Sequence, residues 1–222
     1  MSVDSSLSRE FTALLGRYTA NTRLRDTLWR EISRAYSAQG RHYHTLAHLE
    51  HMLYELRGFQ RKVSETIRDW DSLLFALYYH DLVYVPASDK NEAQSAEIAA
   101  LRLGEIGFPP RGIEKTRRLI RATQKHMAVE DEDTNCFMDA DLSILGQSRE
   151  IYLDYAKRVR REYAMFPQPV YNAGRIKALR SFLEMPAIFK TRHFHEHFEL
   201  QARKNLIAEL AILNAPLPLE PP

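Results

Sequence analysis

The sequence predicts an all-α protein, for two reasons. Apolar residues recur at three- and four-residue steps through most of the 222 residues, which is the periodicity of amphipathic helices. The alternation of apolar and polar residues that marks β-strands is almost absent. No internal repeat, low-complexity segment or break in composition divides the chain, so we expect one helical domain over residues 1–215 and a frayed tail over residues 216–222.

The first four expected helices differ in their start and stop signals. Residues 6–20 begin with serines suited to capping, and residues 22–39 keep the helical pattern until Gly40 stops it. A histidine-rich helix follows over about 45–59. Residues 64–81 open with a capping-box serine and become wholly apolar near their end, which is typical of a buried helix.

The rest of the chain continues the helical pattern after a loop over residues 82–90. An acidic stretch over residues 130–135 should be solvated, and a short apolar segment with two aspartates follows it over residues 136–146. Further helices are expected over residues 91–107, 112–126, 148–166, 170–186 and 193–213.

Composition excludes several classes of function. The net charge is only +2, from 31 Lys and Arg against 29 Asp and Glu, so nothing favours nucleic acid or an anionic membrane as a partner. A single cysteine, Cys136, excludes intramolecular disulfides and thiolate metal sites. We see neither a signal peptide nor an apolar run near the ~20 residues that cross a bilayer. We therefore expect a cytoplasmic protein.

Histidines and acids gather in apolar surroundings. The stretch "RHYHTLAHLEHML", from Arg41, holds four of the nine histidines, and His44, His48 and His51 are spaced to share one helix face. "HD" at 80–81 ends an apolar helix, and two aspartates lie within "FMDADLSIL". Taken singly, Asp81 and Asp141 also fit a simpler role as helix caps.

Taken together, the same residues favour a metal site. Two imidazoles and two carboxylates suit one divalent cation in octahedral coordination, such as manganese, iron, cobalt, nickel or magnesium. Two coordination positions would stay open for water and substrate, as in catalytic metal sites. The expected ligands are His48, His80, Asp81 and Asp141.

At this point the sequence resembles a known superfamily. His48, "HD" at 80–81 and Asp141 are similar to the H…HD…D signature of the HD-domain metal-dependent phosphohydrolases. The blocks "RHYHTLAH", "YYHDLVY", "KNEAQSA", "TQKH", "DADLSILG", "REY", "GR" and "ARKNL" resemble a branch of small predicted phosphohydrolases, over nearly the whole chain. The resemblance implies a single HD-domain helical bundle. It also selects Asp141, an aspartate followed by an apolar run, over Asp139 as the ligand.

A second resemblance bears on His44. "YHTLAH" is similar to the "YHNxxH" of the cyclic-nucleotide phosphodiesterases, in which the second histidine binds metal and the first protonates the leaving oxygen. By that comparison His48 is the ligand and His44 is a candidate general acid, although Thr45 replaces the family's asparagine. A neighbouring carboxylate would be needed to keep His44 protonated beside a cation. A metal ligand and a packing residue remain alternative roles for His44.

Other residues have weaker signals. Glu92 is a candidate to orient or deprotonate the metal-bound water, or it simply favours the dipole of its helix. His126 is a further ligand or a phosphate contact, or a histidine favoured at a helix C-terminus. His51 is expected behind the ligands or at the surface, and His42 outside the site. Candidate phosphate contacts are Arg41, Lys90 and Arg175, whereas the "HFHEHF" cluster at 193–198 is expected at the surface.

The sequence therefore favours a hydrolase that cleaves a phosphoester or phosphoanhydride bond with a metal-activated water. The expected partner is a small phosphorylated substrate, a nucleotide; the oligomeric state is not predicted. Two alternatives stay open. The HD fold also supports a diiron oxygenase, for which His126 and His44 would be the extra ligands. A nucleotide-binding sensor without turnover is the other.

Overall fold

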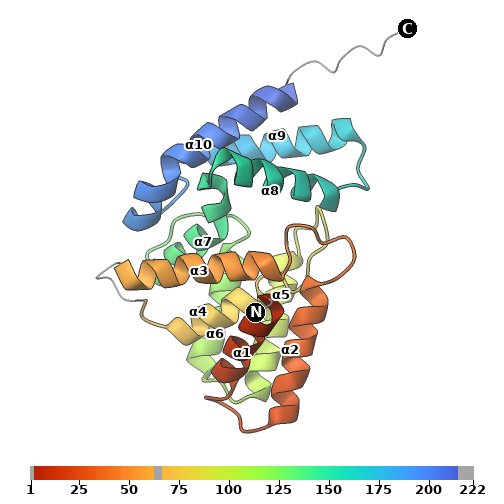
Figure 1. Cartoon of the computed structure of the whole chain (residues 1–222). Coiled ribbons are helices and arrows are strands. Elements are labelled where there is room, and N and C mark those ends of the chain that lie inside the picture. The colour runs from red at the N-terminus through yellow and green to blue at the C-terminus, as the bar shows by residue number, and fades with distance from the viewer. Residues whose placement is uncertain (1–2, 63–66, 215–222) are drawn as a thin grey trace. The chain divides into compact units, whose positions relative to one another are not determined.

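The computed structural model describes residues 3–62 and 67–214, and within them it contains helices and no strand (Figure 1). The all-α prediction is confirmed. Of the described helices, none has the length and apolar character that crossing a membrane requires. The elements are α1 Val3–Leu15, α2 Thr22–Tyr36, α3 Leu46–Lys62, α4 Trp70–Tyr79, α5 Asn91–Glu105, α6 Pro110–Ala122, α7 Glu132–Leu142, the 3-10 helix η1 Ser143–Gly146, α8 Arg149–Glu162, α9 Gln168–Glu184 and α10 Arg192–Asn214.

The chain forms two compact units, Met1–Asp141 and Leu142–Pro222. The expectation of one domain over residues 1–215 stays a prediction. The expected frayed tail, 216–222, lies outside the described residues. Most of the predicted site residues belong to the first unit.

The buried helix of the first unit is α4. Its residues from Ser72 to Tyr79 are all buried, and α4 packs against α3, α5 and α6. Phe11 of α1 adds ring contacts with Phe75 and Tyr78. Because α4 is apolar on every side, it carries the next residue, His80, into the core, where its exposed fraction is only 1%.

The predicted start of this helix is wrong. The helix begins at Trp70 rather than near residue 64, and Ser64 itself lies outside the described residues. The side chain of Asp69 accepts a hydrogen bond from the backbone N–H of Ser72, so Asp69 is the N-cap. The backbone N–H groups of Arg68 and Asp69 are bound by the carboxylate of Asp133, which fixes this entry.

The predicted solvation of residues 130–135 is also wrong in part. Asp133 is buried, and the ammonium of Lys115 lies 2.9 Å from its carboxylate. Asp131 caps α7 through the backbone N–H of Thr134. The acidic stretch therefore begins a helix, and the apolar segment expected after it continues that helix as far as Leu142.

Two asparagines close the loops that lead into α5 and α7 in the same way. The side chain of Asn91 accepts a hydrogen bond from the N–H of Val85 and donates one to its carbonyl. Asn135 pairs identically with Val129, also six residues earlier. Each side chain imitates a backbone amide, so each loop is held against the first turn of the helix that follows it.

In the second unit, η1 packs against α8 and α10, and α9 lies beside α10 (Figure 1). Asn205 of α10 donates hydrogen bonds to the carbonyls of Leu145 and Gln147. Gly146 contacts Phe198 so closely that a side chain at this position would have no room. The blocks "DADLSILG" and "ARKNL" thus meet in one structural contact.

Candidate metal centre

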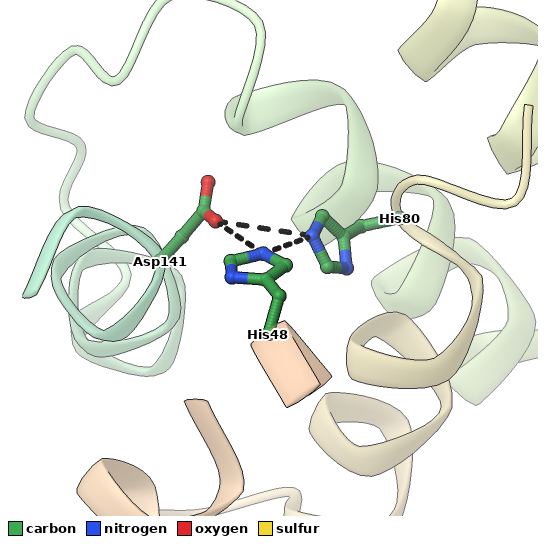
Figure 2. Close-up of side chains that lie close together, drawn as sticks. All are labelled: His48, His80 and Asp141. Carbon is green, nitrogen blue, oxygen red and sulfur yellow. Dashed lines mark hydrogen bonds and ion pairs between the residues drawn. The ribbon is translucent and has the colours of Figure 1, made fainter. Parts of the chain in front are cut away.

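Two imidazole nitrogens and one carboxylate oxygen converge inside the first unit, as Figure 2 shows. His48 lies in the first turn of α3, His80 directly follows α4, and Asp141 lies in the last turn of α7. The Nε2 atom of His48 is 3.2 Å from Nε2 of His80 and 3.2 Å from Oδ1 of Asp141. The Nε2 of His80 is 3.8 Å from the same oxygen. These three residues form a group that could hold a metal ion.

The spacing of the three donors fits a shared ion. Ligand atoms that lie ~2.1 Å from a cation at right angles to one another are about 3 Å apart. The separations in the group, 3.2 to 3.8 Å, are close to that value. Two imidazoles and a carboxylate are also donors that divalent transition metals accept. The residues present therefore fit a divalent cation.

The position of His80 suits metal binding through Nε2. Its Nδ1 lies 2.9 Å from the carbonyl oxygen of Leu77, an acceptor, so the proton belongs on Nδ1 and Nε2 is left to face the group. Burial lowers the pKa of His80, but the negative charges of Asp81 and Asp141 outweigh burial and raise it to about 9. The surroundings of Nε2 thus favour a positive charge at this point.

His48 is buried beside it without a charge. Burial lowers the pKa of His48, which favours the neutral imidazole, the form that binds metals. Within the described residues its Nδ1 has no hydrogen-bond partner, and its ring packs 5.0 Å from the ring of Tyr43. On the Nδ1 side, packing against Tyr43 rather than a hydrogen bond therefore holds this imidazole.

Asp141 divides its two oxygens between two tasks. Oδ1 faces the two imidazoles, while Oδ2 lies 2.9 Å from Nε2 of His126. Burial raises the pKa of Asp141, but hydrogen bonds from His126 and His48 outweigh burial and hold it well below its usual range. His126 has a φ of +51°, an arrangement that costs a residue with a side chain about 1–3 kcal/mol. The strained backbone aims this ring at Asp141.

Asp81, a predicted ligand, contacts His80 but lies outside the group of three. Its Oδ2 lies 3.2 Å from Nε2 of His80, but Asp81 is not one of the three converging residues. The backbone N–H of Asp81 donates a hydrogen bond to the hydroxyl of buried Tyr36. Tyr36 is a residue that sequence reasoning missed, because its position reads as ordinary core.

The sequence predicted that His44 shares a helix face with the ligands, and this prediction is wrong. It lies in the bend before α3, which begins at Leu46. Its Nε2 is 3.9 Å from Oδ2 of Asp81, and its ring packs 4.2 Å from the ring of Tyr84. A carboxylate able to favour a protonated His44 is therefore beside it.

Glu92, in the first turn of α5, points one oxygen into the protein. Its Oε2 is buried, and the described residues offer it no hydrogen-bond partner. Burial raises the pKa of Glu92, and the negative charges of Asp81 and Asp141 act in the same direction. A carboxylate with a raised pKa is a stronger base than an exposed one.

The three predicted phosphate contacts have different surroundings. Arg41 donates hydrogen bonds to the backbone carbonyls of His44 and Leu82, so it joins the two loops of the site. Lys90 is exposed where α5 begins. Arg175 belongs to the second unit, where its guanidinium binds Glu209 at 2.8 Å. Phosphate binding by these residues stays a prediction.

The other histidines are peripheral. His51 is half-buried behind His48, and burial lowers its pKa to about 4. His42 is exposed. At the start of α10, His195 and His197 are exposed, as predicted for the cluster at 193–198, whereas His193 is half-buried and Phe194 is buried.

Comparison of the chain with protein families, with curated proteins and with solved structures finds no match. The resemblance to HD-domain phosphohydrolases accordingly stays a prediction, and the site is interpreted from its own residues.

Proposed function

We propose that the protein is a metal-dependent phosphohydrolase that cleaves a phosphoester or phosphoanhydride bond, in a nucleotide. The observation that carries this proposal is the group of His48, His80 and Asp141, whose donor atoms face one point inside the protein. His80 already directs its Nδ1 proton elsewhere, which favours binding of a cation through Nε2. Asp81 would complete the ligand set after a small side-chain movement.

A bound divalent ion would supply Lewis acidity, which lowers the pKa of a water molecule and polarises a phosphoryl oxygen. The protein's own residues would supply the proton transfers. Glu92 would accept the proton of the attacking water on its buried Oε2. The water oxygen would form a bond to phosphorus as the bond to the leaving oxygen breaks, and His44 would donate a proton to that oxygen.

Several contacts support these roles. The 3.9 Å separation of His44 from Asp81 favours the protonated imidazole that a general acid needs. The exposed ammonium of Lys90 lies two residues before Glu92, where an anionic substrate would meet a positive charge. A neutral or cationic substrate gains nothing from this arrangement.

The test is a screen of phosphate release. Purified protein is freed of metal, and manganese, cobalt, nickel and magnesium are supplied in turn against a panel of nucleotides. The proposal predicts phosphate release that depends on metal and is lost in the His48→Ala variant. Absence of release with every metal and nucleotide would contradict it.

The same preparation separates the other classes of function. Two iron ions per chain with consumption of dioxygen would indicate an oxygenase. An intact nucleotide that copurifies with the protein, without turnover under any metal, would indicate a sensor. One ion per chain with phosphate release supports the hydrolase.

A further inference from the structure

A groove of about 540 Å3 lies on the first unit. Some of its lining residues are neighbours in sequence of residues at the candidate metal centre. Its apolar lining comes from Val83, Ala93 and Ile98. Val83 is two residues after Asp81, and Ala93 directly follows Glu92. The lining of the groove is therefore adjacent in the chain to both acids.

The groove is preformed. The N–H of Val83 donates a hydrogen bond to the hydroxyl of Ser95, which fixes the loop against α5. The α5 and α6 helices pack together, and the side chain of Gln124 donates a hydrogen bond to the carbonyl of Asp89. Both walls are therefore held without a ligand. Its volume is within the range of about 300–1,000 Å3 that is usual for small-molecule sites.

The polar residues of the groove indicate the chemistry of the ligand. Arg121 and Lys90 are cations, and Glu97 is bound by Arg121 at 2.6 Å, so one net positive charge is left. That charge is on Lys90, whose ammonium makes no hydrogen bond or ion pair with the described residues. Gln94, exposed on α5, offers an amide donor and an acceptor. Apolar lining, an amide and a cation suit a flat heterocycle that carries a phosphate.

We propose that this groove binds the nucleoside part of a nucleotide whose phosphate is at the metal centre. This inference rests on the proposed function for its choice of an organic phosphate. The ring would pack on Val83, Ala93 and Ile98, its edge would meet the amide of Gln94, and Lys90 would bind a phosphate oxygen. The groove would thereby select substrates by the group that hydrolysis leaves intact.

Binding measurements test this directly. Full-length protein loaded with Mn2+ is titrated calorimetrically with the four common ribonucleoside monophosphates and with inorganic phosphate. We expect at least one nucleotide to bind more tightly than phosphate. The Ala93→Trp variant, which fills the groove from an exposed helix position, should weaken that nucleotide ~10-fold or more and leave phosphate unchanged, because only the ring loses its contact.

Leu101→Trp is the matched control, since Leu101 is 60% exposed on the same helix and does not line the groove. It should bind the nucleotide within ~2-fold of wild type. Ile98→Ala, which removes apolar lining without adding bulk, gives a second variant with the same expected direction. Equal nucleotide affinity in Ala93→Trp and Leu101→Trp, or nucleotides that bind no better than phosphate, would overturn the proposal.

Phosphate release distinguishes this failure from that of the proposed function. If Ala93→Trp weakens nucleotide binding but no turnover is found, nucleoside binding in the groove is supported and the hydrolase is refuted. Turnover together with a nucleotide affinity that Ala93→Trp does not change would support the hydrolase and refute nucleoside binding in the groove.

Discussion

Each unit of the protein buries a cluster of ionisable side chains, and the two clusters are built in opposite ways. In the second unit, Arg175 binds both carboxylate oxygens of Glu209, at 2.8 and 2.9 Å, and Tyr152 donates a hydrogen bond to the same carboxylate. In the first unit, the Nε2 atoms of His48 and His80 face each other, and Glu92 Oε2 has no partner among the described residues.

The difference separates a structural cluster from one that can bind a ligand. Glu209 and Arg175 neutralise each other and satisfy each other's hydrogen bonds, so no further charge is needed. The cluster of the first unit places two carboxylates around the imidazoles, and their negative charge both raises the pKa of His80 to about 9 and favours an added cation. A buried ionisable group therefore indicates function only where its partners leave it incomplete.

The largest expected effect concerns turnover in the first unit. If His44 is the general acid, His44→Ala should lower turnover by ~10²–10⁴-fold and leave metal content and folding nearly intact. The loss should shrink for a nitrophenyl phosphoester, whose leaving group needs little protonation. The matched control is His42→Ala, from an exposed position in the same bend. A parallel fall in metal occupancy would instead make His44 a ligand, and a fall in thermal stability alone would make it a packing residue.

The second effect concerns stability in the second unit. Arg175→Met leaves Glu209 buried without its partner, so we expect the free energy of unfolding in urea to fall by about 3–5 kcal/mol. The control is Arg158→Met, because Arg158 forms an exposed pair with Asp154 and its loss should cost no more than ~1 kcal/mol. Metal content should not change in either variant. Similar stability losses in both variants would contradict the description of a closed structural cluster.

A smaller effect is expected at His126, which orients Asp141. His126→Asn keeps a residue type that tolerates a positive φ but removes the ring, so the affinity for Mn2+ should fall ~10–100-fold. The neighbouring substitution Lys125→Asn, at an exposed position, should leave that affinity unchanged. An equal affinity in the two variants would show that the 2.9 Å contact with Asp141 does not support metal binding.

Most of the helices are predictable from sequence, because periodicity reports which face is buried. The start of α4 is not, since it depends on Asp133, which is distant in the chain and binds the backbone of Arg68 and Asp69. The same contact explains why the acidic stretch at 130–135 is partly buried. From sequence alone, a charged residue such as Asp133 is expected in solvent, because its buried partners are distant in the chain.

The converging donors are predictable because histidine and aspartate are rare in apolar surroundings unless something binds them. Their supporting contacts are not. The orientation of His126 depends on a positive φ, and that of His80 on the carbonyl of Leu77, and neither has a signal in residue type. The position of Asp81 outside the converging group depends on where α4 ends.

Metal content in two aspartate variants tests the account most directly. Asp139 and Asp141 are two residues apart on α7, and only Asp141 belongs to the converging group. The wild-type protein, Asp141→Asn and Asp139→Asn are each loaded with Mn2+, dialysed and measured for metal per chain, with folding checked by circular dichroism. We predict one ion in the wild type and in Asp139→Asn, and none in Asp141→Asn. Stoichiometric metal in folded Asp141→Asn would contradict the account.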